Sequence, residues 1–398
     1  MKAKILPAIF LLFGLIIWGC NGGSGGTPST GSGGSSSSNS NPGWTQLNPT
    51  GGPPHERDYG VTVAGDGQGN LILFGGAYSG CGGRCNLNDT WVLSHANGLN
   101  GTPAWTQLLP NGTLPAARDN QSGAYDSASN RLIIFGGCLG GCTPAANDVW
   151  VLSNANGIGG TPAWTQLSPA GTAPQPRINS AVALDAKTDR LIVFGGQDGG
   201  GAGGVFTDAW ILTDADGLGG TDPLTGNSTP TWIQLQPSNA GPAAGYQASA
   251  MYDPSSNELI IAGGSTTAAN NNAVWILSNA NGSGGTPAWN NVIATTSASS
   301  APPVFSLAWP VYDAVHNRGL FPLATGDLQQ WLLDNANNIS GNAAWAAYPA
   351  NTGPAIGGVL GSAYDSTNNI MTAWVTSGSG SNVANQLWVL NNANDLAN

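Results

Sequence analysis

The feature that most constrains this chain is a segment that recurs along its length. Residues 130–167, NRLIIFGGCLGGCTPAANDVWVLSNANGIGGTPAWTQL, hold an apolar run ending in Gly-Gly, an Asp-x-Trp run, an Asn-Ala-Asn-Gly turn and a Trp-Thr-Gln-Leu run. Copies of this order, fainter toward the C-terminus, place their first tryptophans 56 to 65 residues apart, at Trp91, Trp150, Trp210, Trp275, Trp331 and Trp388. A period of this length with strand-like segments inside it predicts a propeller or a similar array.

Each repeat is expected to contain four short strands, named A to D. Strand A ends in Tyr-Asp or Leu-Asp, as at Tyr125-Asp126, and strand B is a continuous apolar run such as residues 132–135, typical of a strand buried on both faces. Strand C carries the first tryptophan and strand D the second, here Trp150 and Trp164. β-branched and aromatic residues bounded by Gly, Asn and Pro favour strands over helices, so we predict an all-β fold.

The order of these motifs resembles the kelch repeat, in which each repeat forms one four-stranded blade of a β-propeller. The resemblance runs from Pro42 to the C-terminus and is most specific in the first three repeats. Ala262 replaces the Phe before Gly-Gly in repeat four, and repeats five and six are assigned by their tryptophans and Tyr-Asp turns. The resemblance implies a six-bladed propeller over residues 43–398, with repeats like those of the central domain of galactose oxidase.

The two ends of this region predict how the ring closes. Trp44-Thr45-Gln46-Leu47 reads as a strand D with no strands A to C before it, and Leu387-Trp388-Val389-Leu390 as a strand C with no strand D after it. We expect the N-terminal strand to complete the C-terminal blade, because closure removes two exposed sheet edges.

The first 42 residues are predicted to lie outside the fold. Lys2 and Lys4 precede an apolar region, and residues 1–19 are typical of a signal peptide. The segment ending at Cys20 resembles a bacterial lipobox, which implies lipidation of Cys20, while residues 20–42 include a flexible Gly/Ser-rich linker. We expect an exported lipoprotein of the cell envelope or surface, touching the membrane through its lipid only; the alternative is a secreted protein.

The net charge of the chain limits the classes of partner that it can bind. Without the first 20 residues, 8 basic residues face 21 acidic ones, a net charge of about −13. This balance argues against nucleic acid and anionic lipid surfaces, which favour basic patches. We expect a monomer that binds a protein or a glycan.

Antiparallel order places the D–A and B–C connections on one face and the A–B and C–D connections on the other. The B–C loops differ between blades, which is typical of a scaffold's functional face. Three arginines open strand A in successive blades, so converging guanidiniums could hold an anionic group; the alternative is that each bonds locally. The candidate ligand-binding residues are Arg57, Arg118, Arg177, Tyr78 and Arg84.

Four cysteines remain after Cys20, and in an exported protein an even number predicts disulfides. We expect the local pairs Cys81–Cys85 and Cys138–Cys142. The segment 214–217 with Asp222 faintly resembles a calcium loop, but the other blades have Asn-Ala-Asn-Gly there, so we predict no metal and no cofactor.

Three classes of function fit the sequence. The leading interpretation is a binding module for protein or glycan that uses the D–A/B–C face. The alternatives are a purely architectural surface protein and a sugar-processing enzyme of the lyase or isomerase type. A copper-radical oxidase is disfavoured because the only three histidines, His55, His95 and His316, are scattered. No catalytic residue is predicted.

Overall fold

The computed structural model describes residues 43–395, except 59, 80, 82, 143–144, 201–203, 244, 267–268, 294–301, 307, 349–352 and 379–382. The predicted signal peptide, Cys20 and the linker lie outside the described residues. Every regular element in the described part of the chain is a strand. The search of this part found no helix that is long and apolar enough to cross a membrane.

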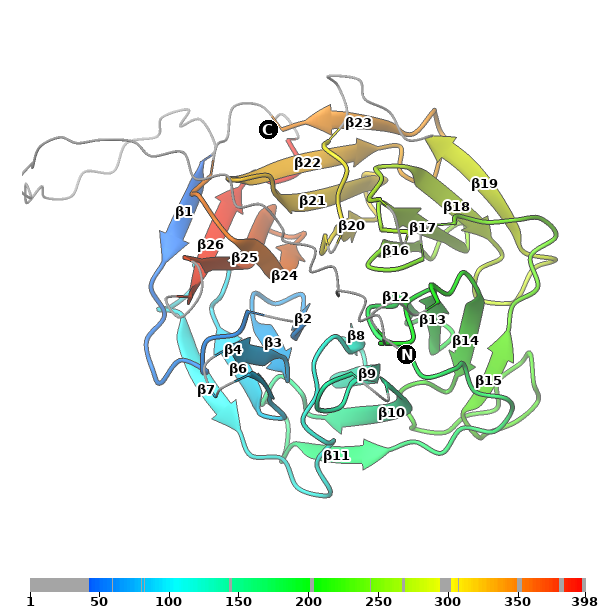
Figure 1. The fold of residues 1–398 in the computed structure, drawn as a ribbon, viewed down its shortest axis with the longest axis horizontal. Coiled ribbons are helices and arrows are strands. Elements are labelled where there is room, and N and C mark those ends of the chain that lie inside the picture. The colour runs from blue at the N-terminus through cyan, green and yellow to red at the C-terminus, as the bar shows by residue number, and fades with distance from the viewer. Residues whose placement is uncertain are drawn as a thin grey trace, which may run out of the picture. The chain divides into compact units, whose positions relative to one another are not determined.

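Six four-stranded antiparallel sheets follow one another around a ring (Figure 1). This confirms the predicted six-bladed all-β propeller. Blades 1 to 3 contain, from strand A to strand D, β2 (Thr62–Gly65), β3 (Leu71–Phe74), β6 (Thr90–Ser94) and β7 (Ala104–Leu108); β8 (Ser122–Asp126), β9 (Arg131–Cys138), β10 (Ala145–Ser153) and β11 (Ala163–Gln166); and β12 (Ala181–Asp185), β13 (Arg190–Phe194), β14 (Ala209–Thr213) and β15 (Thr231–Gln234).

The other three blades repeat the same order, and the last one draws its strand D from the start of the body. They contain β16 (Ser249–Asp253), β17 (Glu258–Ala262), β18 (Val274–Ser278) and β19 (Ala288–Ile293); β20 (Val311–Asp313), β21 (Arg318–Ala324), β22 (Leu328–Asp334) and β23 (Ala344–Ala347); and β24 (Gly358–Asp365), β25 (Ile370–Ser377), β26 (Ala384–Asn391) and β1 (Trp44–Leu47). Strand β1 pairs antiparallel with β26, with Thr45 opposite Val389.

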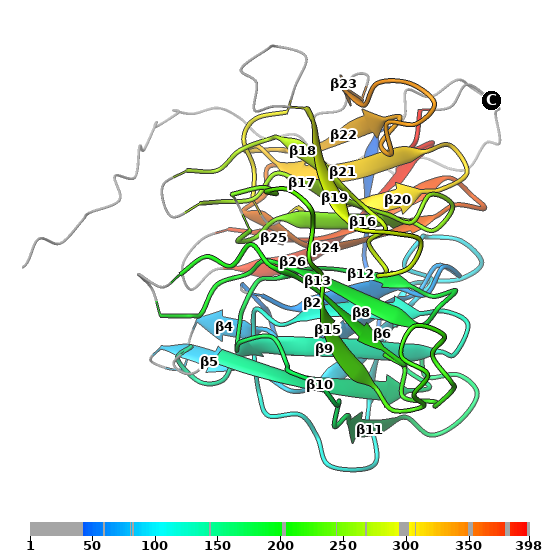
Figure 2. The same ribbon diagram turned by 90° about the vertical axis from the view of Figure 1, so that its right-hand side faces the viewer.

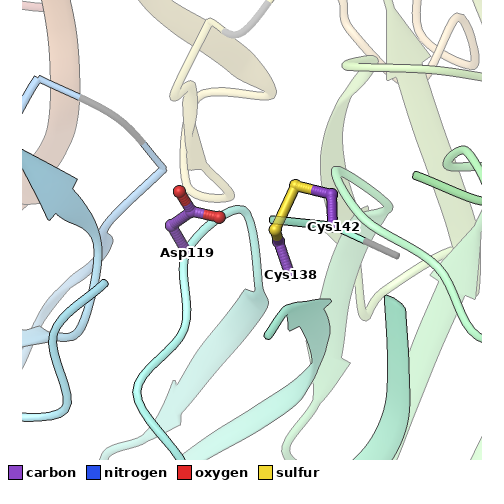
Figure 3. A group of neighbouring side chains, drawn as sticks. All are labelled: Asp119, Cys138 and Cys142. Carbon is purple, nitrogen blue, oxygen red and sulfur yellow. A yellow bond between two sulfur atoms is a disulfide. The ribbon is translucent and has the colours of Figure 1, made fainter. Parts of the chain in front are cut away.

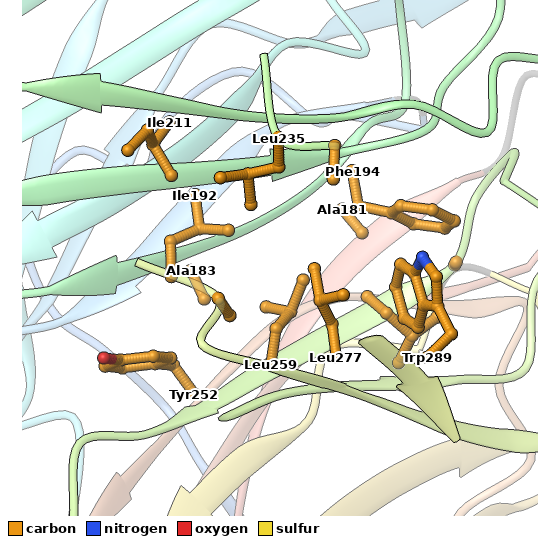
Figure 4. Close-up of a cluster of buried hydrophobic side chains, with 14 residues drawn as sticks. Ala181, Ala183, Ile192, Phe194, Ile211, Leu235, Tyr252, Leu259, Leu277 and Trp289 are labelled. Atoms are coloured by element: carbon orange, nitrogen blue, oxygen red, sulfur yellow. The ribbon is translucent and has the colours of Figure 1, made fainter. Parts of the chain in front are cut away.

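Neighbouring blades are held together by aromatic contacts between strand B of one blade and strand D of the next. The ring of Phe194 lies 5.1 Å from that of Trp289 across the interface of blades 3 and 4, among buried aliphatic side chains (Figure 4). Phe74 meets Trp164 at 4.8 Å, and Phe135 meets Trp232 at 5.3 Å. The periodic tryptophans of strand D therefore pack between blades.

Two tryptophan or phenylalanine residues outside the repeat pattern fill the same role. Blade 4 has the small Ala262 in strand B, and Phe305 from the following D–A loop packs its ring edge-on against Trp345 at 5.9 Å. In blade 6, Trp374 lies in strand B and meets Trp105 of blade 1 at 5.9 Å. Trp374 is thus a core residue.

On the A–B/C–D face, hydrogen bonds of one kind join four pairs of neighbouring blades. The aspartate that ends strand A accepts a hydrogen bond from an asparagine in the C–D turn of the following blade, at 2.8 to 3.0 Å. These pairs are Asn281–Asp185, Asn337–Asp253, Asn394–Asp313 and Asn97–Asp365. The last pair joins blade 1 to blade 6, so this seam runs across the point where the ring closes.

The D–A/B–C face carries an additional hairpin. Strands β4 (Ala77–Ser79) and β5 (Arg84–Asn86) form it within the B–C loop of blade 1, and Figure 2 shows it beyond the end of the blade sheets. A disulfide joins Cys81 to Cys85 in this hairpin, and a second joins Cys138 to Cys142 in the B–C loop of blade 2. Both pairings agree with the sequence prediction.

Candidate functional site

The start of strand A brings polar side chains to the axis of the ring. Asn120, Asn179 and Gln247 occupy equivalent positions two residues before strand A and have φ of 52°, 51° and 55°. Polar residues tolerate this left-handed conformation better than bulky apolar ones. Each backbone N–H donates to the previous blade: Asn120 to Gly60, Asn179 to Asn120 and Gln247 to Asn179, at 2.8 to 3.2 Å. These successive backbone hydrogen bonds between blades hold the three side chains around the axis.

These side chains border a pocket of about 650 Å³ on the D–A/B–C face. One wall is polar and comes from blades 1 to 4. The other wall is mostly apolar and comes from loops and strand ends of blades 4 to 6, with Asn270, Ser306, Thr325 and Thr376 as its polar residues. The polar wall includes Asp58, Arg84, Asn120, Asn179, Tyr246 and Gln247, and the apolar wall includes Val304, Phe305, Trp309, Leu323 and Val359.

A smaller cavity of about 150 Å³ continues along the axis. It shares Asn179, Gln247 and Trp309 with the larger pocket and is otherwise lined by small neutral residues. Beside it, serine hydroxyls join neighbouring A strands: Ser122 donates to the carbonyl of Ser180 and Ser249 to that of Ala308. The pocket is therefore wide at the loops and narrow toward the centre of the ring.

One of the two charged residues that line the pocket, Arg84, lies in the loop that the Cys81–Cys85 disulfide closes. Arg84 pairs through Nε with the carboxylate of Asp119, whose side chain is fully buried. Asp119 exchanges backbone hydrogen bonds with Cys138, and its carboxyl group lies beside the Cys138–Cys142 disulfide (Figure 3). Burial raises the pKa of Asp119 despite the nearby Arg84, and the charge of Asp58 adds to this effect.

The three arginines that the sequence placed at the start of strand A lie four or five residues before it and do not converge on a ligand, so that prediction was wrong. Arg57, Arg118 and Arg177 are at most 1% exposed. Each donates to the carbonyl of the first glycine of its own Gly-Gly pair and to an aspartate two residues before the strand C tryptophan. The alternative of local bonding is what the structure shows. The aspartates are Asp89, Asp148 and Asp208.

The close approach of neighbouring blades at the Gly-Gly pairs explains why these arginines are buried. The second glycine of each pair donates its N–H to a carbonyl in the segment that precedes strand A of the next blade, as from Gly137 to the carbonyl of Arg177 at 3.0 Å. A Cβ on Gly136, whose φ is 65°, would lie 2.6 Å from that same carbonyl. Because the two glycines carry no Cβ, their segment can lie close to the backbone of the next blade at Arg177. The arginine side chains are buried where these segments meet.

Two of these ion pairs lower the pKa of their aspartates, Asp148 and Asp208. Burial alone would raise the pKa of Asp148, but hydrogen bonds from Arg118 and Trp150 and the charge of Arg118 outweigh it. The same causes, with Arg177 and Trp210 as donors, lower the pKa of Asp208. The charges of Arg118 and Arg177 therefore pair with aspartates inside the fold.

The remaining two predicted residues have different positions. Arg84 lines the pocket as expected. Tyr78 lies in the same hairpin but stacks on His55, with ring centroids 3.8 Å apart, and is not among the described lining residues. The axial amides were not predicted from the sequence. A polar residue before strand A in Arg118-Asp119-Asn120 and Arg177-Ile178-Asn179 was the available signal.

Among the described residues, two groups of side chains have the composition of metal ligands. The sulfurs of Cys138 and Cys142, near Asp119, are joined in a disulfide and offer no thiolate. Asp189, Asp214 and Asp216 bring carboxylate oxygens within 4.8 Å of one another, where other blades have amides. Asp222, considered with the faint calcium loop, instead pairs with Arg190 at 2.9 Å.

The fold and the motifs together define a repeat propeller with a loop-built axial pocket. Residues 100–217 match the KLHDC2/KLHL20/DRC7 Kelch-repeats domain family. The chain therefore contains a kelch-repeat segment within its six-bladed β-propeller. Kelch propellers commonly act as protein-interaction modules.

The buried arginine pairs lead to a first prediction. Arg118→Ala should lower the free energy of unfolding by about 3 kcal/mol, because it removes a buried guanidinium and leaves the partly buried Asp148 without its partner. Lys187→Ala, at an exposed turn, is the control and should change stability by less than about 0.5 kcal/mol. Denaturant titration under oxidising conditions measures both. An unchanged value for Arg118→Ala would contradict the structural role assigned to this arginine.

The acidic turn of blade 3 leads to a second prediction. Burial and the neighbouring Asp216 and Asp214 raise the pKa of Asp189 to about 7. The folded protein then retains a proton that the unfolded chain has released, so stability should fall as pH rises from about 4 through about 7. Asp189→Asn supplies the amide of the other blades and should remove this loss, which we expect to be about 1 kcal/mol or more.

The measurement for Asp189 is the free energy of unfolding at several pH values across this range. Asp198→Asn, in an exposed B–C loop, is the matched control and should keep the wild-type pH profile. If Asp189→Asn also keeps that profile, Asp189 is not the group that titrates.

Proposed function

We propose that this protein is an exported binding module that captures a protein partner in the axial pocket of its D–A/B–C face. The observation that carries the proposal is the pocket itself, about 650 Å³ with one polar and one apolar wall. Pockets that combine apolar surface with a few placed polar groups are typical ligand sites. The side-chain amides of Asn120, Asn179 and Gln247 can pair with peptide groups, and the apolar wall can hold a side chain.

The shape of the pocket supports a peptide segment as the ligand. The narrow axial cavity gives room for one slender group, while the wide mouth leaves space for the chain on either side. A glycan could use the same amides through its hydroxyl groups, and the test below separates the two ligands. The architectural alternative requires that nothing bind in this pocket.

The enzyme alternative has less support from the described residues. The pocket brings together Arg84, Asp58 and Tyr246, but burial raises the pKa of Tyr246 above its ordinary value, against the effect of Asn179 and Arg84. A tyrosine that acts as a base benefits from a lowered pKa. We therefore propose binding without turnover.

Export and anchoring belong to the same proposal. An apolar segment ending at Cys20, followed by a Gly/Ser-rich tether, supports a lipoprotein whose propeller stands off the membrane. The two disulfides in the body support an oxidising compartment. Secretion without lipid is the alternative.

Blocking the pocket tests the binding proposal. Val304 lines the pocket and is 50% exposed, so Val304→Trp should fill the mouth without disturbing the core. Peptides selected from a random library on the full chain should bind this variant at least roughly tenfold more weakly. Ile158→Trp, at an exposed C–D turn, is the control. Equal binding by both variants would place the ligand elsewhere, and binding of glycans alone would identify a carbohydrate module.

Replacing Cys20 tests the anchor. In the native host the wild-type protein should fractionate with membranes, and its mature N-terminal peptide should carry the mass of a lipid. Cys20→Ser should move the protein to the soluble fraction without changing peptide binding. A soluble wild-type protein with an unmodified N-terminus would instead support secretion.

A further inference from the structure

The described loops of the D–A/B–C face carry a net negative charge, although several arginines lie in them. The three buried Arg–Asp pairs cancel. Of the remaining charged side chains in the described loops of this face, only Arg84 is basic. The acidic ones are Glu56, Asp58, Asp119, Asp198 and Asp327.

The polar end of the pocket carries an uncompensated carboxylate. Asp58 lines the pocket, and its Oδ2 accepts the N–H of Ser79 at 3.2 Å. Its Oδ1 is buried and finds no hydrogen-bond partner among the described residues, and the same is true of Oδ1 of Asp119. The one guanidinium nearby, Arg84, is paired with Asp119. Because no ion pair with a basic side chain is found for Asp58 among the described residues, a cationic ligand in the pocket would balance the charge of this carboxylate.

The aromatic residues of the pocket fit the same ligand. Tyr246, Phe305 and Trp309 line it together with Asp58. Aromatic faces attract ammonium and guanidinium groups, and a carboxylate next to them adds charge complementarity. The net charge of about −13 outside the first 20 residues would also favour the approach of a cationic partner.

We propose that the axial pocket binds a lysine or arginine side chain presented by an extended segment of the partner protein. The cationic head lies beside Asp58, and the aliphatic stem packs on the wall formed by Val304 and Trp309. This inference rests on the proposed function, because it specifies the ligand of the same pocket.

The test uses three pools of short random peptides that differ only in containing Lys and Arg, Asp and Glu, or neutral residues. The full chain should retain the basic pool, more strongly at low than at high ionic strength. Asp58→Asn keeps an acceptor for Ser79 but removes the charge, and should weaken binding roughly tenfold. Glu258→Gln removes one charge from the A–B/C–D face and should leave binding unchanged.

The other outcomes overturn the inference in distinguishable ways. Retention of the acidic or neutral pool, lost on Val304→Trp, would refute the cationic ligand and leave the protein-binding function standing. Retention of the basic pool that is insensitive to Asp58→Asn and to Val304→Trp would place the cation site outside this pocket. If no pool is retained, both the inference and the protein-binding function fail.

Discussion

The packing of each sheet on its neighbour is the interaction on which the rest of this structure depends. A single four-stranded blade cannot bury both its faces, so its strand B is shielded only when the next blade supplies an aromatic ring. The contact between Phe194 and Trp289 is typical of the interfaces. Where Ala262 leaves strand B too small, Phe305 enters from a loop and restores the contact. The aromatic ring at a blade interface can therefore come from a loop as well as from strand B.

The two faces of the ring use polar residues in different ways. On the A–B/C–D face, the aspartate that ends strand A and the asparagine of the next C–D turn repeat in four described interfaces, and this leaves little hydrogen-bonding capacity free there. In blade 3 the asparagine is replaced by Asp216, which has no amide to donate. There Arg131 of blade 2 donates to the backbone carbonyl of Asp216 at 3.0 Å.

The D–A/B–C face is asymmetric, and this asymmetry produces the pocket. Blades 1 to 3 fill their loop ends with Arg–Asp pairs, whereas the segment around Val304 and Phe305 brings apolar residues to the same level. Polar groups on one side and apolar groups on the other give a site that can orient an amphipathic ligand. The disulfide-closed hairpin then adds Arg84 at the charged end.

The sequence by itself determined the architecture. The spacing of tryptophans, the apolar runs before Gly-Gly and the orphan strand at Trp44 predicted six four-stranded blades, because strand burial and turn chemistry are local properties of the chain. It also predicted both disulfides, since each pair is closed within one loop. Only the tertiary structure decided the charge of the site. Arg118 and Asp148 lie 30 residues apart in the sequence. An arginine, a Gly-Gly pair and an aspartate occur together in blades 1 to 3, and this repeated combination was the available indication that the two charges pair with each other. Which charges cancel depends on distances across the fold, and in this propeller those distances bury three guanidiniums and leave Asp58 at the pocket.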